Sequence, residues 1–271
     1  RIKMGGLYMN EILLIIAILP VILLGTYIYK KDKHKEPSSL LVKLFISGII
    51  STFIVVIVSV IATIIFPFLN ENYATMSALE FFVYIFISIA LLEEVCKWIM
   101  SYYIGYKNKE FDEFYDIIVY AVFVALGFAA FENILYVFDL QSIQIGIFRG
   151  LLAIPGHVCD GIAMGYYLSL AKYHEQKGNK QEEKRNKIKS ILIPTLYHGI
   201  YDYCCLANSN IILITFIVFI IFLYTTSFKK IKLLSQENIT VTKQNNYCPN
   251  CGTKVIDKYC PNCGLKIERK D

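Results

Sequence analysis

Residues 88–101 read SIALLEEVCKWIMS and place two adjacent glutamates and a lysine inside an apolar run of membrane-spanning length. A charged side chain at bilayer depth costs roughly 2.5–3.5 kcal/mol on insertion scales. Glu93 and Glu94 therefore require either a compensating partner or a function. Lys97 follows Glu93 by four residues and Glu94 by three, so one carboxylate can pair with its ammonium on the same helix face. The other carboxylate is then free to face the interior of a helix bundle.

The rest of the chain has the composition of a polytopic membrane protein. Of its 271 residues, 56% are hydrophobic, which is too apolar for an ordinary soluble domain. The net charge of +5 is better explained by membrane topology than by affinity for nucleic acid, so no nucleic-acid partner is expected. Long apolar runs must satisfy their backbone groups internally, so we predict an all-α protein of about seven transmembrane helices. The runs cover residues 11–29, 40–68, 80–104, 116–138, 145–171, 190–206 and 209–228.

Lysine and arginine are distributed unevenly between the loops. The loops near residues 30–35, 107–109, 172–189 and 229–232 are rich in them, whereas 70–79, 139–144 and 207–210 contain none. Loops rich in Lys and Arg remain in the cytoplasm. We therefore expect a multi-pass plasma-membrane protein with its N-terminus outside and its C-terminus in the cytoplasm.

The chain divides into four segments. Residues 1–8 precede Met9, which we expect to be the natural start because the codons of Gly5 and Gly6 can spell a ribosome-binding sequence. Residues 9–233 form the predicted transmembrane domain, and 234–246 form a polar linker. Residues 247–271 form a small separate domain.

This last domain repeats one motif, YCPNCGTKV at 247–255 and YCPNCGLKI at 259–267. Two residues between paired cysteines let both thiolates bind one ion, and four thiolates close the site. We predict a ribbon that holds structural zinc, because the alternative of two redox disulfides is disfavoured in a reducing cytoplasm. A closed site has no open position for catalysis, so the ribbon would stabilise the chain or bind a cytoplasmic partner. The predicted ligands are Cys248, Cys251, Cys260 and Cys263.

The apolar runs contain more ionisable side chains than a passive bundle needs, and such residues usually have a function. His198 and Asp202 are four residues apart, which suits an imidazole with an orienting carboxylate. Three helices can bring a glutamate, His157 and His198 to one depth. That set can bind Zn²⁺ with an open water position, or activate water without a metal. The full set is Glu93, Glu94, Lys97, Glu132, Arg149, His157, Asp160, His198 and Asp202.

Each of these residues also has a structural explanation. Glu93, Glu94 and Lys97 could form a buried ion pair with one neutral carboxylic acid, and Glu132 could pair with Arg149 across two helices. The histidines could be hydrogen-bonding groups in helix packing. For the whole protein, a membrane ion or proton carrier and a catalytically silent sensor acting through the ribbon are alternatives to a hydrolase. The sequence shows no inverted repeat, which disfavours the carrier.

Four short motifs occur in order on successive predicted helices. They are EExxK at 93–97, FExxxY at 131–136, HxxxG at 157–161 and HxxxD at 198–202. In this order they resemble the PrsW family of bacterial intramembrane proteases, which shares a superfamily with CAAX prenyl-protein proteases and bacteriocin-immunity proteins. The resemblance covers roughly residues 10–228 and leaves the ribbon outside.

The resemblance implies an intramembrane endopeptidase of metallo- or glutamic type in the bacterial plasma membrane. It implies a single-pass membrane protein as substrate, with site-1 cleavage of an anti-sigma factor in response to envelope stress. The lipid bilayer is the other expected partner.

The resemblance also implies roles for individual residues. Glu93 and Glu94 match the family's paired glutamates, and either is expected to act as general base. His157 and His198 match its histidines and are expected to bind a catalytic divalent metal, preferably zinc, together with Glu94. Without a metal, the histidines would position water.

The remaining motif residues have supporting roles in this interpretation. Asp202 is expected to orient His198, and Lys97 to keep one glutamate ionised. Glu132 matches another acidic position of the family and is a further candidate in the cavity.

Overall fold

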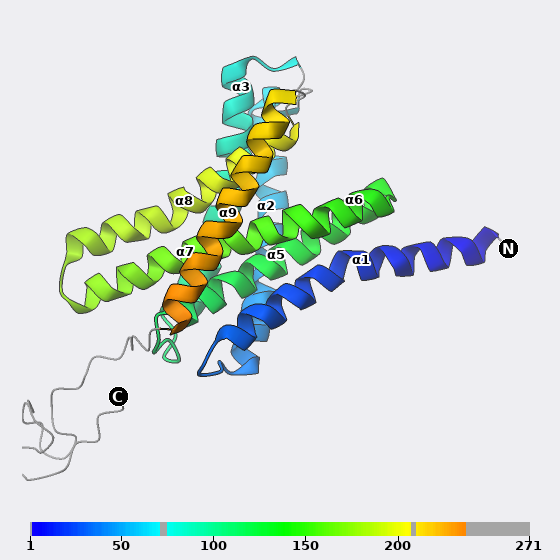
Figure 1. The fold of residues 1–271 in the computed structure, drawn as a ribbon. Coiled ribbons are helices and arrows are strands. Elements are labelled where there is room, and N and C mark those ends of the chain that lie inside the picture. Colours follow the sequence, from blue (N-terminus) through cyan, green and yellow to red (C-terminus); the bar gives the residue numbers. More distant parts are fainter. Residues whose placement is uncertain (1, 71–74, 207–209, 237–271) are drawn as a thin grey trace, which may run out of the picture.

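The structure is a computed structural model that describes residues 2–70, 75–206 and 210–236 (Figure 1). Within these ranges all regular structure is helical. The four predicted zinc-ligating cysteines lie outside the described residues, so the ribbon and the boundaries of the linker stay predictions.

Seven helical stretches, some interrupted by wider turns, run through the described part of the chain. Three of the short segments are π-helical: η3 (Val83–Leu91), η4 (Ser101–Tyr106) and η5 (Arg149–Ala153). The elements are α1 (Ile2–Lys31), α2 (Ser38–Ile65), η1 (Pro67–Asn70), α3 (Ala78–Phe82), η3 (Val83–Leu91), α4 (Leu92–Met100), η4 (Ser101–Tyr106), α5 (Asp116–Leu140), α6 (Ile143–Phe148), η5 (Arg149–Ala153), α7 (Ile154–Gln176), α8 (Lys180–Leu206) and α9 (Asn210–Gln236).

Five of the described helices are long and apolar enough to cross a membrane, by length and composition. They are Met9–Lys31, Ser38–Ile65, Asp116–Leu140, Ile143–Gln176 and Ile212–Ser235. The predicted runs at 80–104 and 190–206 are helical but are not among the five. The first carries Glu93, Glu94 and Lys97 within its apolar part, and the second continues a helix whose first half is densely charged.

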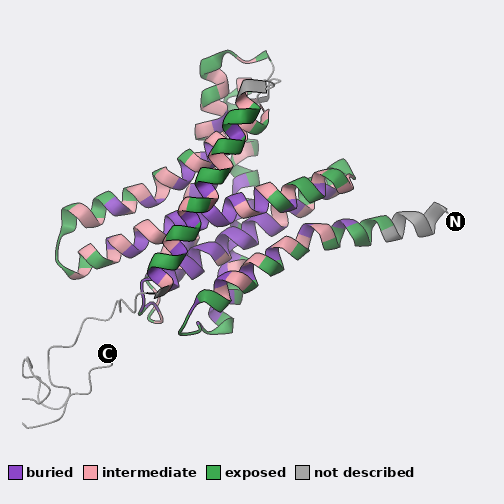
Figure 2. Ribbon diagram, in the orientation of Figure 1, coloured by how far each residue is buried: buried purple, intermediate pink, exposed green. Residues whose placement is uncertain are grey.

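Helix α5 lies at the centre of the bundle and is buried along most of its length (Figure 2). Its contact with α2 is a backbone-to-backbone crossing at two glycines. A methyl group added at Gly48 would overlap the carbonyl oxygen of Val124, and one at Gly127 would overlap that of Phe45. Small residues at both sides of the crossing therefore allow the two helices to touch.

Helix α7 approaches the other side of α5 in the same way. A Cβ atom at Gly161 would lie 3.0 Å from the carbonyl oxygen of Ala121, and Gly165 packs against the backbone of Ile118. His157 precedes Gly161 by one helical turn. The close approach therefore brings the His157 side chain to the surface of α5 that carries Glu132.

The stretch that carries the two glutamates forms a regular α-helix between two irregular helical segments. Helix α4, which carries Glu93, Glu94 and Lys97, is flanked by the π-helical segments η3 and η4. π-Helical turns are rare and occur frequently at functional sites. The widened turns were not predicted from the sequence, because no residue pattern in this stretch marks them.

Candidate active site

Glu94 lies at the centre of a buried polar network. Its side chain is fully buried, and Oε1 accepts a hydrogen bond from Lys97 Nζ at 2.7 Å. The same oxygen lies 2.9 Å from Nδ1 of His198. Its second oxygen, Oε2, has no hydrogen-bond partner. One carboxylate oxygen is thus fixed by α4 and α8, while the other is available to a ligand.

Lys97 connects this carboxylate to the second histidine. Its Nζ lies 3.1 Å from His157 Nδ1 and 4.1 Å from the ring centroid of Phe128. His157 Nε2 in turn lies 2.9 Å from Oε2 of Glu132 on α5. The ammonium is almost fully buried, so these contacts replace the water that it loses.

Glu132 is held by a cation as well as by the histidine. Arg149 donates from Nη2 to Glu132 Oε2 at 2.9 Å and from Nε to Asn133 Oδ1 at 3.0 Å. Its guanidinium also stacks 3.9 Å from the ring centroid of Tyr136. The pairing of Glu132 with Arg149 that the sequence allowed is therefore present, and it coexists with the contact to His157.

The second ring nitrogen of His198, Nε2, lies near two carboxylates. Nε2 lies 3.3 Å from Asp202 Oδ2, one turn later on α8, and 3.7 Å from Glu93 Oε2. The rings of His157 and His198 are 5.2 Å apart between centroids. Glu93 lies 3.7 Å from Lys97 and its Oε2 makes no hydrogen bond. Glu94 rather than Glu93 is therefore the closely paired carboxylate.

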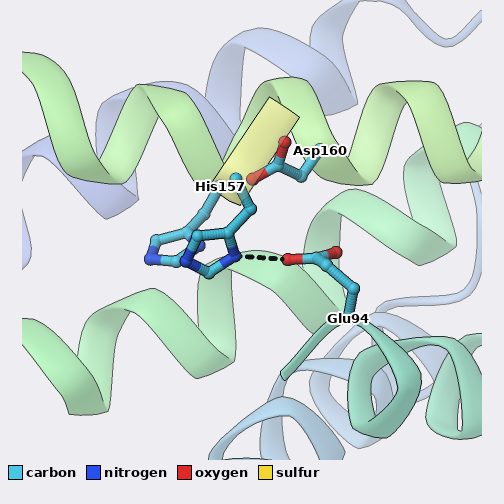
Figure 3. Close-up of side chains that lie close together, drawn as sticks. Glu94, His157 and Asp160 are labelled. Carbon is cyan, nitrogen blue, oxygen red and sulfur yellow. Dashed lines mark hydrogen bonds and ion pairs between the residues drawn. The ribbon is translucent and has the colours of Figure 1, made fainter. Parts of the chain in front are cut away.

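Asp160 adds a third carboxylate to this space, from α7. It is 3% exposed, and its Oδ1 has no hydrogen-bond partner. Figure 3 shows Glu94, His157 and Asp160 directed into the same space. From the sequence, Asp160 was among the intramembrane candidates without an assigned role. Its position three residues after His157 was the signal that the two side chains share that face.

These donors have the chemistry of a metal site. One ligand atom from each of Glu94, His157, Asp160 and His198 lies within 4.8 Å of the others. Nitrogen and carboxylate oxygen are ligands that Zn²⁺ accepts, and the unpartnered oxygens of Glu94 and Asp160 fit a bound cation. Both nitrogens of each histidine are in polar contacts, so a metal would have to replace one contact at each ring.

A small cavity opens beside these groups. Its volume is about 30 Å³, enough for a water molecule or an ion but not for a peptide. The side chains around it come from five helical elements, including Leu223 of α9. They are Glu132, Arg149, Ala153, Gly156, His157, Asp160, Tyr197, His198, Tyr201, Asp202 and Leu223.

The structure brings all the intramembrane candidates from the sequence into this one network. Lys97, Glu132 and Asp202 each contact one of the two histidines, while Glu93 lies 3.7 Å from His198. Asn133, which the sequence did not single out, joins through Arg149. The catalytic roles assigned to these residues stay predictions, because contact alone does not establish chemistry.

Comparison with known proteins identifies similar chains. A model of the family described as PrsW family intramembrane metalloprotease matches residues 36–226. A curated protein named Protease PrsW from Oceanobacillus iheyensis is 34% identical over 226 residues, covering 82% of this chain and 96% of the relative. Relatives of the same name from Clostridioides difficile and Bacillus subtilis are 33% and 32% identical, covering 81% and 82% of this chain and 90% and 95% of the relatives. No solved structure matches.

Proposed function

Because this chain belongs to the PrsW family of intramembrane proteases, we propose that its active site is the buried cluster around Glu94, His157 and His198. The reaction is hydrolysis of a peptide bond in a membrane-anchored protein. One observation carries this assignment: four buried ligand groups from α4, α7 and α8 converge, and three of them, His157, Asp160 and His198, line a cavity large enough for a water molecule. Two of their oxygens have no partner, which is the arrangement that a reacting water or a metal ion requires.

Residues of this buried network can activate water. Glu93 Oε2 makes no hydrogen bond and lies 3.7 Å from both Lys97 Nζ and His198 Nε2, so it is free to accept a proton from water. Glu94 is less suited to that task through Oε1, which is already shared by Lys97 and His198. Its free Oε2 can hold the attacking water or a cation.

The positions of the two histidines are fixed by acidic partners. Asp202 contacts Nε2 of His198 and Glu132 contacts Nε2 of His157, which orients both rings. An oriented imidazole can donate to the carbonyl oxygen of the scissile bond or return a proton to the leaving amine. The two acidic residues thus act through the histidines and not on the substrate.

A catalytic divalent metal, preferably zinc, would be held by Glu94, His157 and His198, with Asp160 as a fourth donor. When bound, such an ion would polarise the scissile carbonyl and lower the pKa of water. Such an ion would have to replace one of the polar contacts at each histidine ring. A glutamic mechanism needs no such change, and the two mechanisms are separated by the metal content of the purified protein.

The substrate and topology follow from the family and the loop charges. The chain would cross the membrane seven times, with stretches 78–106 and 180–206 sheltered by their neighbours, the N-terminus outside and the C-terminus in the cytoplasm. Cys248, Cys251, Cys260 and Cys263 would hold structural zinc in a cytoplasmic ribbon that binds a partner. The substrate class is a single-pass protein of the anti-sigma-factor type, cleaved at site 1 under envelope stress.

Mapping of peptide N-termini in membranes tests this proposal. Cells would express the intact chain, the Glu93→Gln/Glu94→Gln variant, or the control Glu182→Gln, which changes a glutamate in the charged first turn of α8. We expect new termini in a single-pass protein with the intact chain and the control, and none with the double variant. Identical termini in all three membranes would remove the assignment of these glutamates to the chemistry.

A further inference from the structure

A second group of buried carboxylates lies far from the active site in the sequence. Asp32 is in the connection between α1 and α2, Glu113 is in the loop before α5, and Asp116 begins α5. Figure 1 shows the α1–α2 connection and the loop before α5 at the same end of the bundle. One oxygen from each of the three residues lies within 4.8 Å of the others. The exposed fractions of Asp32, Glu113 and Asp116 are 3%, 8% and 0%.

The hydrogen bonds within this group leave oxygens unused. Asp116 Oδ2 accepts from the backbone N–H groups of Asp112 and Glu113, at 3.0 and 2.6 Å, but its Oδ1 has no partner. Neither oxygen of Asp32 has a hydrogen-bond partner. Three buried carboxylate oxygens on two residues are thus directed at no donor.

One member of this group has a histidine partner, since His34 Nδ1 pairs with Oε1 of Glu113. Lys35 donates to the backbone carbonyls of Tyr29 and Asp32. Glu36 is also buried and accepts a hydrogen bond from Tyr120 at 2.5 Å, which adds a further carboxylate beside the group.

Burial without pairing is unfavourable for charged carboxylates. Burial raises the pKa of Asp32, although the charge of Lys35 opposes the shift. Burial also raises the pKa of Glu36, to about 7. Such a group either retains protons or surrounds a cation, and these two states predict different responses to added metal.

We propose that Asp32, Glu113 and Asp116 bind a hard divalent cation, Ca²⁺ or Mg²⁺, at the end of the bundle where α1 meets α2. Carboxylate oxygens are the ligands that both cations prefer, and sulfur and nitrogen donors are not required. The unpartnered oxygens of Asp32 and Asp116 supply donor atoms, and Glu113, which also pairs with His34, supplies a third carboxylate. Because Asp116 begins α5, the cation would fasten the α1–α2 connection to the central helix.

Cation binding by the full-length chain in detergent tests the proposal. Calcium chloride and magnesium chloride would be titrated separately by calorimetry into intact protein treated with a chelating resin. We expect one site per chain with a Kd below about 1 mM for at least one cation. Asp32→Asn should weaken this binding about tenfold or more, because affinity follows the charge of the ligand set. Asp139→Asn, an exposed carboxylate at the other end of α5, should leave it unchanged.

Two further variants make the result decisive. Glu94→Gln/Asp160→Asn should retain the site, and loss of binding in that variant together with retention in Asp32→Asn would overturn the proposal. Glu113→Gln replaces Asp32→Asn if the latter does not fold. Absence of binding for both cations up to about 10 mM would also overturn it, since that lies beyond the weakest natural calcium modules. In that case the carboxyl groups retain protons.

Discussion

The ammonium of Lys97 lies 3.1 Å from Nδ1 of His157, and this contact decides which nitrogen of the ring carries the proton. An ammonium can only donate, so Nδ1 accepts and Nε2–H donates to Glu132. Lys97 also donates to Glu94 at 2.7 Å. One buried lysine therefore connects the glutamate motif of α4 to the histidine of α7 and sets the state of both.

Replacing Lys97 alone should destabilise the protein more than replacing Lys97 and Glu94 together. Lys97→Met leaves the buried Glu94 carboxylate beside His198 but without its ammonium partner, which we expect to lower the free energy of unfolding by about 3–5 kcal/mol. The double variant Glu94→Gln/Lys97→Met should regain much of this stability and remain inactive. Unfolding in detergent by denaturant titration measures both, with exposed Lys180→Met as the control. A double variant no more stable than Lys97→Met would contradict the pairing.

Asp202 should affect catalysis through the orientation of His198. Asp202→Asn keeps the size of the side chain but removes its charge, so we expect cleavage to fall about 10–100-fold, as for other residues that orient active-site histidines. The loss should appear in kcat with KM almost unchanged if Asp202 acts through His198, as we propose, and not on the substrate. Asp202→Glu should recover part of the rate. An equal loss in both Asp202 variants through KM alone would show that the residue binds substrate.

Substitution of Asp160 tests whether this residue is a metal ligand or an unpaired buried acid. If it binds a catalytic metal, Asp160→Asn should lower activity about 10–100-fold and reduce the metal content. If it does not, the amide removes a buried charge without a partner, and the protein should become more stable with activity intact. Activity assays and thermal unfolding of the same preparation give the answer.

The crossing of α2 and α5 should not tolerate a side chain at its glycines. Gly48→Ala and Gly127→Ala each place a methyl group on the backbone of the opposite helix, and overpacking of this kind costs about 1–3 kcal/mol or more. Gly25→Ala is the matched control, because its methyl would meet only the end of the flexible Leu126 side chain at 3.3 Å. Thermal unfolding should show lower midpoints for Gly48→Ala and Gly127→Ala than for Gly25→Ala. Equal midpoints for Gly48→Ala and Gly25→Ala would mean that the helices separate easily.

The zinc content of the purified chain should separate the two catalytic mechanisms. A metalloprotease with a zinc ribbon holds two zinc ions per chain, whereas a glutamic protease holds one. Cys248→Ser/Cys251→Ser should remove the ribbon ion, and Glu94→Gln/His198→Ala should remove the second ion only in the first case. Mass-spectrometric metal analysis counts them. A single zinc that survives the Glu94 and His198 changes would favour the glutamic mechanism.

Contacts within one helix were predictable from the sequence, because the helical period sets them. The three-residue spacing of Glu94 and Lys97 and the four-residue spacing of His198 and Asp202 both correspond to close contacts in the structure. The positions of the helical stretches were also close to the apolar runs. These features depend on local geometry alone.

Contacts between helices were not predictable in the same way. The contact of Lys97 with His157 joins α4 to α7, and the sequence specifies the distance between these helices only through packing of the whole bundle. The group formed by Asp32, Glu113 and Asp116 was missed because its members come from separate connections and the first turn of a helix. Glu113 and Asp116 are three residues apart, but no spacing rule relates either of them to Asp32, and only the folded bundle brings all three together.

The cavity of the candidate active site is smaller than the substrate that it would cut. A space of about 30 Å³ admits water but not a polypeptide, so cleavage at this site would require the surrounding helices to separate. The free energy of that opening would then enter the apparent affinity for every substrate. A passing transmembrane helix that does not stabilise the open form would be spared, whatever its sequence at the scissile bond.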